Sequence, residues 1–269
     1  MTTGGSSHSD AALRFGMQIL QPSMDAPTLL TVVKRSEDRP RGQAILEEAA
    51  RTFSDSQPHI NLKLRVGSPP EEIVAEAREG SYDLVIVGER RTHGLKTRVL
   101  GSTAIHVVEH APCSVIVAKG KIGQVQRILL CDSGGLQPDV LTRFTVSLAE
   151  RITGEESVTV LHVMSQITAA SGVPDDQLRA DAHQLIEVHA PEGEWLERDL
   201  ALLSAPQIRP NAKVRHGTVV YEILEEAREG DYDLVVVGAH RDQGWQRWLL
   251  EDISHKVITL LDRPVLVVR

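Results

Sequence analysis

The chain has few cysteines and no long apolar run. Its 269 residues include only Cys113 and Cys131, too few for a disulfide framework. Each lies at the edge of an apolar run that is typical of a strand, so we expect two buried free thiols in a reducing cytoplasm. No segment approaches the roughly 18 consecutive apolar residues that a membrane-spanning helix needs. These absences exclude a disulfide-stabilised fold and an integral membrane protein.

The chain also lacks an excess of basic charge. Its net charge is −8, and its Lys and Arg residues are scattered along the sequence. This distribution argues against nucleic acid or an anionic membrane surface as a partner. The first ten residues, MTTGGSSHSD, contain neither the basic nor the apolar region of a signal peptide. We therefore expect a cytoplasmic protein.

An internal repeat organises the sequence. Residues 65–91 and 215–241 are identical at 16 of 27 positions, at a constant offset of 150 residues. Such identity indicates duplication, and it predicts two domains of ordinary size. We place the first domain at residues 1–118, a short polar linker at 119–126 and the second domain at 127–269.

Strands and helices alternate within each copy. In the first copy, apolar or alternating runs predict strands, and amphipathic segments between them predict helices. Nearly continuous apolar strands connected by helices are typical of a parallel sheet covered on both faces. The predicted strands of the first copy are 28–33, 60–66, 84–87 and 115–118, and those of the second include 127–131, 158–164 and 212–215.

The segment 82–102 carries the clearest functional signal. A predicted strand ends at Gly88, a polar loop follows, and Gly101 precedes a helix predicted over 103–110. The N-terminus of a helix presents unpaired backbone N–H groups and the positive end of the helix dipole. This arrangement suits a phosphate group.

Several stretches resemble the universal stress protein family, and the resemblance covers nearly the whole chain. They include ILLCDSGG, VTVLHVM, GSPPEEIVAEAREGSYDLVIVG, LGSTAIHVVEHAPCSVIVAK and DRPVLVV. The resemblance implies two flavodoxin-like (Rossmann-like) five-stranded parallel sheets in tandem, with strand order 3-2-1-4-5. It also implies an ATP-phosphate motif, Gly, two residues, Gly, nine residues, Gly-Ser/Thr, and an Asp after the first strand that helps to hold adenosine.

In the first domain the resemblance implies a site for ATP with Mg²⁺. Arg91 stands where the motif has its second Gly, so its side chain either obstructs the phosphates or donates to them. The Asp has no counterpart, because counting back from the second domain reaches Thr2. The residues implied for this site are Val32 and Val33 near the adenine, and Gly88, Arg91, Gly101, Ser102 and Thr103 at the phosphates.

In the second domain the motif is degenerate. Gly238 is kept, Arg241 takes the second Gly position, and Glu251-Asp252 replaces Gly101-Ser102. Two carboxylates repel a phosphate, so we expect no ATP there, although Asp132 supplies the adenosine-side carboxylate.

The first strand of the first domain is apparently missing. Only Met1 to Thr3 precede the Gly4-Gly5 loop that corresponds to Gly134-Gly135. In the order 3-2-1-4-5 this strand is the centre of the sheet. We expect the true start to lie upstream of Met1; the alternatives are that the domain borrows a strand or closes without one.

Four further signals have structural explanations. His106-Val-Val-Glu109-His110 matches a short zinc-peptidase pattern but fits a solvated helix face, so we expect no metal. Ser133-Gly134-Gly135 resembles the loop of ATP pyrophosphatases, without its Asp and Ser. Trp245 and Trp248 suit either a contact surface or a collapsed loop. The two EAREG segments, 76–80 and 226–230, fit surface helix ends.

Three hypotheses about function stay open. The chain is a stress-adaptation module that binds ATP weakly through its first domain, an interaction protein that binds no nucleotide, or an ATP-cleaving enzyme. No catalytic pair or metal cluster is evident in the sequence, so we expect no enzyme beyond a weak ATPase. The expected partners are an intramolecular pseudo-dimer of the two domains, a second copy in a homodimer, and a protein that the sequence does not identify.

Overall fold

The computed structural model describes residues 1–19, 26–53, 59–89, 101–120, 122–132, 138–152, 154–165, 180–239 and 247–269, with residues 7, 8, 138 and 247–252 described by their backbone alone. The chain divides into two compact units. Unit 1 comprises Met1–Gly123 and Asp262–Val267, and unit 2 comprises Gln124–Leu261 and Val268–Arg269. Both units are α/β folds with mainly parallel strands, as the sequence predicts.

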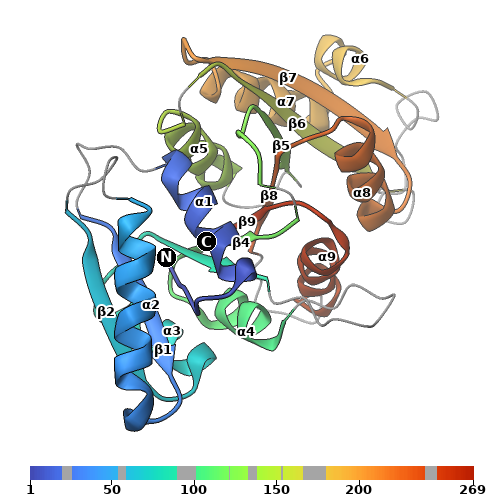
Figure 1. The fold of residues 1–269 in the computed structure, drawn as a ribbon. Helices are drawn as coiled ribbons and strands as arrows, with labels where there is room; N and C mark the ends of the chain where they lie inside the picture. Colours follow the sequence, from blue (N-terminus) through green and yellow to red (C-terminus); the bar gives the residue numbers. More distant parts are fainter. Residues whose placement is uncertain are drawn as a thin grey trace. The chain divides into compact units, whose positions relative to one another are not determined.

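Unit 1 places helices on both faces of its strands. α1 packs on β3 and β4, α2 packs on β1 and β2, and α3 packs beside α4 on the opposite face (Figure 1). β1 pairs in parallel with β2, and β3 pairs in parallel with β4. Its elements are α1 (Ser7–Ile19), β1 (Thr28–Val33), a 3-10 turn (Ser36–Asp38), α2 (Arg39–Arg51), β2 (Asn61–Val66), α3 (Pro69–Glu79), β3 (Leu84–Gly88), α4 (Ser102–His110) and β4 (Ser114–Ala118).

A three-residue segment takes part of the first-strand position of unit 1. The Thr3 N–H donates to the Leu30 carbonyl of β1 at 2.9 Å, and the Thr2 N–H donates to the Ile86 carbonyl of β3 at 3.0 Å. Residues 1–3 therefore join β1 to β3, and the order across unit 1 is β2-β1-(1–3)-β3-β4. Within the described residues, only this short segment stands where the sequence predicts a missing first strand.

Unit 1 also contains the last strand of the chain. β9 (Val265–Val268) pairs antiparallel with β4, with Val115 opposite Val267 and Val117 opposite Val265. Residues 262–267 accordingly belong to unit 1, although they end the second sequence repeat.

Unit 2 has a complete first strand. Parallel pairing gives the order β7-β6-β5-β8, and the Ala239 N–H, directly after β8, donates to the Val268 carbonyl at 2.7 Å. The order β7-β6-β5-β8 corresponds to 3-2-1-4 in the order 3-2-1-4-5 that the family resemblance implies, and β9 is the neighbour of β8 in the fifth position. Its elements are β5 (Arg127–Cys131), α5 (Pro138–Ala149), β6 (Glu156–Met164), α6 (Ala182–Glu187), α7 (Pro191–Leu202), β7 (Ile208–His216), α8 (Val219–Glu229), β8 (Leu234–Gly238) and α9 (Arg247–Leu260).

A buried glutamate joins strand, helix and turn in each unit. In unit 2, Glu226 of α8 is 1% exposed, and its carboxylate accepts hydrogen bonds from Arg215 of β7 at 2.8 Å and from the Tyr232 hydroxyl at 3.0 Å. Lys213 lies 2.6 Å from the same carboxylate. Arg215 also binds Glu222 and Glu229. We call these six side chains the glutamate cluster.

Unit 1 repeats the glutamate cluster at the offset of 150. Glu76, which is 5% exposed, binds Arg65, Lys63 and the Tyr82 hydroxyl. Both EAREG segments end a helix, and their Arg and second Glu are exposed as predicted, but the interpretation as surface is wrong for Glu76 and Glu226. The first Glu of each segment faces inward, because strand cations and a tyrosine hydroxyl satisfy its charge.

The glycine that ends each of these helices makes room for the tyrosine. A Cβ added to Gly230 would lie 2.1 Å from Cε2 of Tyr232, and one added to Gly80 would lie 2.2 Å from the same atom of Tyr82. Tyr232 is 6% exposed, so its ring has little freedom to move away. The spacing Glu-x3-Gly-x-Tyr in both repeats is thus a packing requirement of the glutamate cluster.

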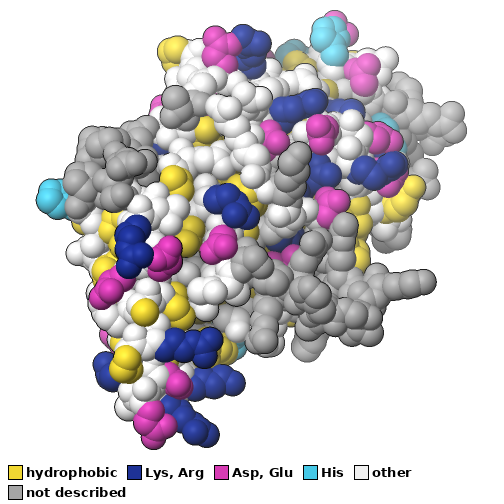
Figure 2. Space-filling model, viewed as in Figure 1, with side chains coloured by type: hydrophobic (Ala, Val, Ile, Leu, Met, Phe, Trp, Pro, Cys, Tyr) yellow, Lys and Arg dark blue, Asp and Glu magenta, His cyan; other side chains and the backbone are white. Residues whose placement is uncertain are grey.

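The described surface carries charges of both signs. On the face drawn in Figure 2, Lys and Arg side chains are interspersed with Asp and Glu. No helix within the described ranges is long and apolar enough to cross a membrane.

We predict that Gly230→Ala destabilises unit 2 by about 1 to 3 kcal/mol, because the new methyl group forces the Tyr232 ring off its position. Urea unfolding measures the loss. Gly123→Ala is the matched control, since a Cβ there meets no atom within 4 Å. Equal effects of the two substitutions would contradict the steric role of Gly230.

We also predict that Glu226→Gln lowers the free energy of unfolding by about 3 kcal/mol at neutral pH, because it removes the buried charge that pairs with the partly buried Arg215. Burial raises the pKa of Glu226, but hydrogen bonds from Lys213, Arg215 and Tyr232 outweigh burial and lower it. Its stabilisation is therefore present above the ordinary glutamate pKa and is lost as the pH falls through the lowered value. The stability curves of parent and variant should converge in acid.

The control for Glu226→Gln is Glu229→Gln. Glu229 binds the same Arg215, but its side chain is 51% exposed, so its loss should change stability little. A Glu229 effect as large as that of Glu226 would show that burial of the carboxylate is not what matters.

Candidate functional site

The phosphate end of the predicted site in unit 1 is the N-terminus of α4. The N-cap is Gly101, with an extended backbone and no side-chain cap, and the first turn contains no acidic residue. The first helical bond runs from the Ile105 N–H to the Gly101 carbonyl at 3.2 Å. The N–H groups of Ser102 to Ala104 therefore have no partner within the helix, and they can donate hydrogen bonds to a bound anion.

The other predicted phosphate residues of unit 1 flank this helix end in sequence. Gly88, the last residue of β3, is half-buried, as are Gly101 and Thr103, whereas Ser102 is exposed. The next residue after Gly88, Glu89, donates its N–H to the Ala118 carbonyl at 3.1 Å. Arg91 lies outside the described residues, so its predicted role at the phosphates stays a prediction.

The adenosine end of unit 1 has a threonine in place of the aspartate. Thr3 donates to the Leu30 carbonyl as Asp132 donates to the Leu161 carbonyl in unit 2. The Thr31 hydroxyl donates to the Thr3 carbonyl at 2.9 Å, where His162 contacts the Asp132 carbonyl. Thr3, not Thr2, is therefore the counterpart of Asp132; the sequence count misses by one because backbone pairing, not loop length, sets the register.

The two valines predicted near the adenine differ in accessibility. Val33 is buried and packs at Gly42 of α2, where an added Cβ would lie 2.8 Å from its Cγ1. Val32 is half-buried. Of this pair, Val32 is the better placed to contact a ligand.

Unit 2 has a different helix start at the corresponding place. α9 begins at Arg247, four residues before Glu251, so the backbone of Glu251 and Asp252 lies inside the helix. The Ser254 hydroxyl donates to the Gly238 carbonyl at 3.0 Å and joins α9 to the end of β8. The backbone N–H groups of Glu251 and Asp252 therefore lie within the helix, whereas those at the start of α4 in unit 1 have no helical partner. Arg241 lies outside the described residues, as do the side chains of Glu251 and Asp252.

Asp132 of unit 2 faces protein groups. Its carboxyl, 9% exposed, lies 3.5 Å from Arg198 of α7, and Arg198 also lies 3.2 Å from Asp199. Asp199 is fully buried and accepts a hydrogen bond from the Thr142 hydroxyl of α5 at 2.9 Å. Burial and the neighbouring Asp132 charge raise the pKa of Asp199. The carboxylate predicted to hold adenosine is thus engaged by α7.

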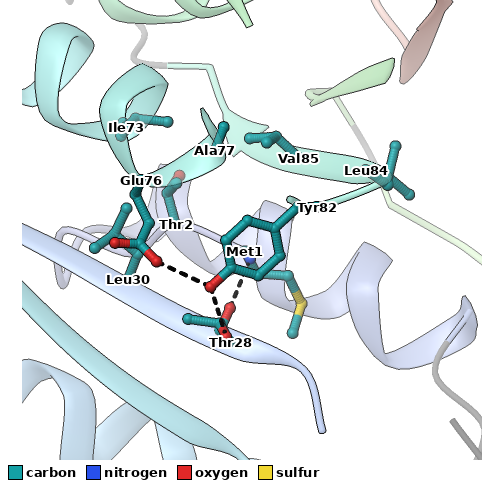
Figure 3. A pocket seen from close by; sticks show the side chains of 10 residues that line it. All are labelled: Met1, Thr2, Thr28, Leu30, Ile73, Glu76, Ala77, Tyr82, Leu84 and Val85. Atoms are coloured by element: carbon teal, nitrogen blue, oxygen red, sulfur yellow. Dashed lines mark hydrogen bonds between the residues drawn. The ribbon is translucent and has the colours of Figure 1, made fainter. Parts of the chain in front are cut away.

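A small cavity lies near the incomplete first strand of unit 1. Its volume is about 30 Å³, roughly the share of one water molecule. Figure 3 shows Tyr82 pointing into it, with the Tyr82 hydroxyl bonded to Glu76 and Thr28. Thr2, Ala77 and Val85 are among its walls. A cavity of this size does not accommodate a nucleotide.

The remaining sequence candidates have limited support. His106 and His110 stack with ring centroids 4.1 Å apart. In the described part of the chain, no group of three or more His, Cys, Asp or Glu could hold a metal ion. Cys113 is buried and Cys131 is partly buried, and neither forms a disulfide. Ser133 to Gly135 and Trp245 lie outside the described residues, as does the side chain of Trp248.

Sequence reasoning missed two polar groups. The glutamate clusters had a signal, because Arg65, Glu76 and Tyr82 all recur at the offset of 150. Arg198 and Asp199 had none, because they lie in a polar helical stretch that unit 1 does not repeat.

Comparison with known proteins agrees with the fold. The universal stress protein family model matches residues 1–119 and 124–269. A universal stress protein of Mycolicibacterium smegmatis is 25% identical over an alignment of 291 residues, which covers 98% of this chain and 94% of the relative. The universal stress protein YxiE of Bacillus subtilis is 31% identical over 85 residues, which covers 32% of this chain and 57% of that protein.

A solved structure has the same fold over the whole chain. The crystal structure of a universal stress protein from Archaeoglobus fulgidus superposes with a TM-score of 0.71 at 18% identity, covering 100% of this chain and 96% of that one. The two units thus define a tandem α/β protein with flavodoxin-like repeats. The chain belongs to the universal stress protein family.

Proposed function

We propose that this chain is a stress-adaptation protein that binds a nucleoside triphosphate weakly, through unit 1 alone. The observation that carries the proposal is the contrast between two helix starts. α4 begins at Ser102 after an uncapped Gly101, whereas α9 extends through the equivalent positions. An anion is stabilised by exposed N–H groups at a helix N-terminus and not by N–H groups inside a helix.

In this proposal the triphosphate of Mg-ATP lies at the start of α4. Gly88 and Gly101 let the backbone approach the phosphates, the Ser102 and Thr103 N–H groups donate to them, and Arg91 adds a charged donor. Val32 borders the adenine. Mg²⁺ offsets the phosphate charge when the nucleotide is bound.

Weak affinity follows from the adenosine end. Thr3 is 6% exposed, and its hydroxyl accepts the Gly5 N–H at 3.4 Å, so it is engaged in its own turn. A hydroxyl so placed does not replace the charged acceptor that the family pattern puts there.

Unit 2 is proposed to bind no nucleotide. Arg198 and Asp199 engage Asp132, and Glu251 and Asp252 place two negative charges at the phosphate end. The unit then contributes through its surfaces, packed against unit 1 as an internal pseudo-dimer, in a cytoplasmic protein that acts on protein partners or forms a homodimer.

A second candidate is an interaction protein that binds no nucleotide at all. The contact between Asp132 and Arg198 of α7 favours this candidate, because it occupies the carboxylate that would hold adenosine in unit 2. A similar contact in unit 1 would leave that unit without a nucleotide site. An ATP-cleaving enzyme is the third and least supported candidate, because Gln137 and Pro138 stand where the ATP pyrophosphatase loop has its Asp and Ser.

Calorimetric titration with Mg-ATP tests the proposal. We predict saturable binding at a single site per chain. Gly101→Glu combined with Ser102→Asp, which copies unit 2, should weaken it at least tenfold, or about 1.4 kcal/mol, through charge repulsion. Circular dichroism verifies folding of each variant.

The matched control is Glu251→Gln with Asp252→Asn, which removes the same two charges from unit 2 and should leave affinity unchanged. Absence of binding by the folded parent would reject the nucleotide and enzyme candidates together. Stronger binding by the control variant would place the site in unit 2 and contradict the proposal.

A further inference from the structure

Asp199 is a buried carboxyl with only half of its hydrogen-bonding capacity used. Its Oδ1 accepts from the Thr142 hydroxyl at 2.9 Å and from Arg198 at 3.2 Å. Its Oδ2 is buried, and no donor among the described residues reaches it. A buried acceptor without a donor costs about 1 to 3 kcal/mol, and more when it is charged. A fully ionised Asp199 is therefore a poor description of this site.

The group next to Asp199 is another acid. The carboxyl of Asp132, directly after β5, lies 3.5 Å from Nη2 of Arg198, the same nitrogen that lies 3.2 Å from Oδ1 of Asp199. Two ionised carboxylates are both acceptors and repel each other, so a bond between them requires a proton on one of them. A single shared proton supplies the donor that Oδ2 lacks.

The local charges lead to the same conclusion. Arg198 lies between the two acids, 3.5 Å from Asp132 and 3.2 Å from Asp199, and it balances one negative charge. Asp139 lies 3.6 Å from Arg198, but it is 44% exposed and also pairs with Arg143 at 3.3 Å. One proton on the Asp132 and Asp199 pair makes the buried group neutral.

Other titratable groups surround this pair. His162 of β6 lies against the Asp132 carbonyl, and burial lowers its pKa, which keeps the ring neutral. The charged or titratable groups on the elements packed around the pair include Cys131 of β5, Asp139 and Arg143 of α5, Arg198 and Glu192 of α7, His162 of β6 and His216 of β7.

We propose that Asp132 and Asp199 share one proton, and that this proton fastens α7 to the carboxyl end of β5 and makes that contact pH-dependent. The inference concerns unit 2 and is independent of nucleotide binding by unit 1. With the proton present, α7 covers Asp132. When the proton leaves, two buried carboxylates face each other with one arginine between them, and the contact opens.

The direction of the pH effect follows from linkage. The folded state holds this proton more tightly than the unfolded state, where both acids have ordinary pKa values. Stability is therefore greatest in mild acid, falls as the pH rises through the window between the ordinary and the raised value, and stays low above it. Within that window the unfolding constant of unit 2 rises up to about tenfold per pH unit for one proton.

Trp195 of α7 supplies a reporter. Its indole makes an edge contact with His162, with ring centroids 5.8 Å apart. In a Trp245→Phe, Trp248→Phe background it is the remaining tryptophan. We predict that its fluorescence changes in one transition between about pH 5 and about pH 9, when α7 separates from β5.

Two variants test whether the carboxyl pair causes the transition. Asp199→Asn keeps the shape and donates an amide hydrogen to Asp132 at every pH, so the transition should disappear and the pH dependence of urea unfolding should flatten. Asp132→Asn should also abolish the transition, because its amide donates to Asp199 at every pH. It replaces Asp199→Asn in the test if that variant does not fold.

His162→Gln is the discriminating control, because protonation of His162 could itself alter Trp195 fluorescence. The transition should persist in this variant. A transition absent from the parent, retained in both asparagine variants, or lost in His162→Gln would overturn the proposal.

Discussion

The buried charge of Glu226, and of Glu76 in unit 1, is the constraint on which much of each unit depends. A carboxylate cannot leave water unless cations and donors replace its hydration. Arg215 and Lys213 supply them from β7, and Tyr232 supplies a hydroxyl from the turn before β8. Satisfying this one group fixes a strand, a helix and the next turn together. The strand that follows this turn ends at Gly238 in unit 2 and at Gly88 in unit 1. The predicted ligand site begins at these glycines.

Duplication has preserved this framework and changed the strand ends. The glutamate clusters match group for group at the offset of 150. The helix after β3 starts at Ser102, whereas the helix after β8 starts at Arg247, earlier in its repeat. The first strand is short in unit 1 and complete in unit 2. Packing constrains the buried half of each unit, whereas the carboxyl ends of the strands are free to diverge.

The sequence allowed most of the fold to be predicted, because its information is local and repeated. Periodicity located the strands and helices, and the repeat gave the register from β2 to β3 and from β7 to β8. The glutamate cluster was misread as surface, because a run of Glu and Arg looks solvated until the strand cations are placed opposite it. Asp199 was unpredictable, since a single acid in a polar helix shows no sign of being buried. The start of α9 was missed because the carboxylates of Glu251 and Asp252 suggested altered charge, not a longer helix.

The pairing of β9 with β4 affects the order in which the protein can be completed. Every helix and strand of unit 2 is synthesised between β4 and β9, the two strands of unit 1 that pair. During synthesis the backbone groups along that edge of β4 remain exposed until residues 265–267 emerge. An open strand edge can pair with another chain. The sheet of the first repeat therefore gains its edge strand, β9, from the second repeat. A ribosomal pause shortly before β9 prolongs the exposure of β4, which is synthesised much earlier.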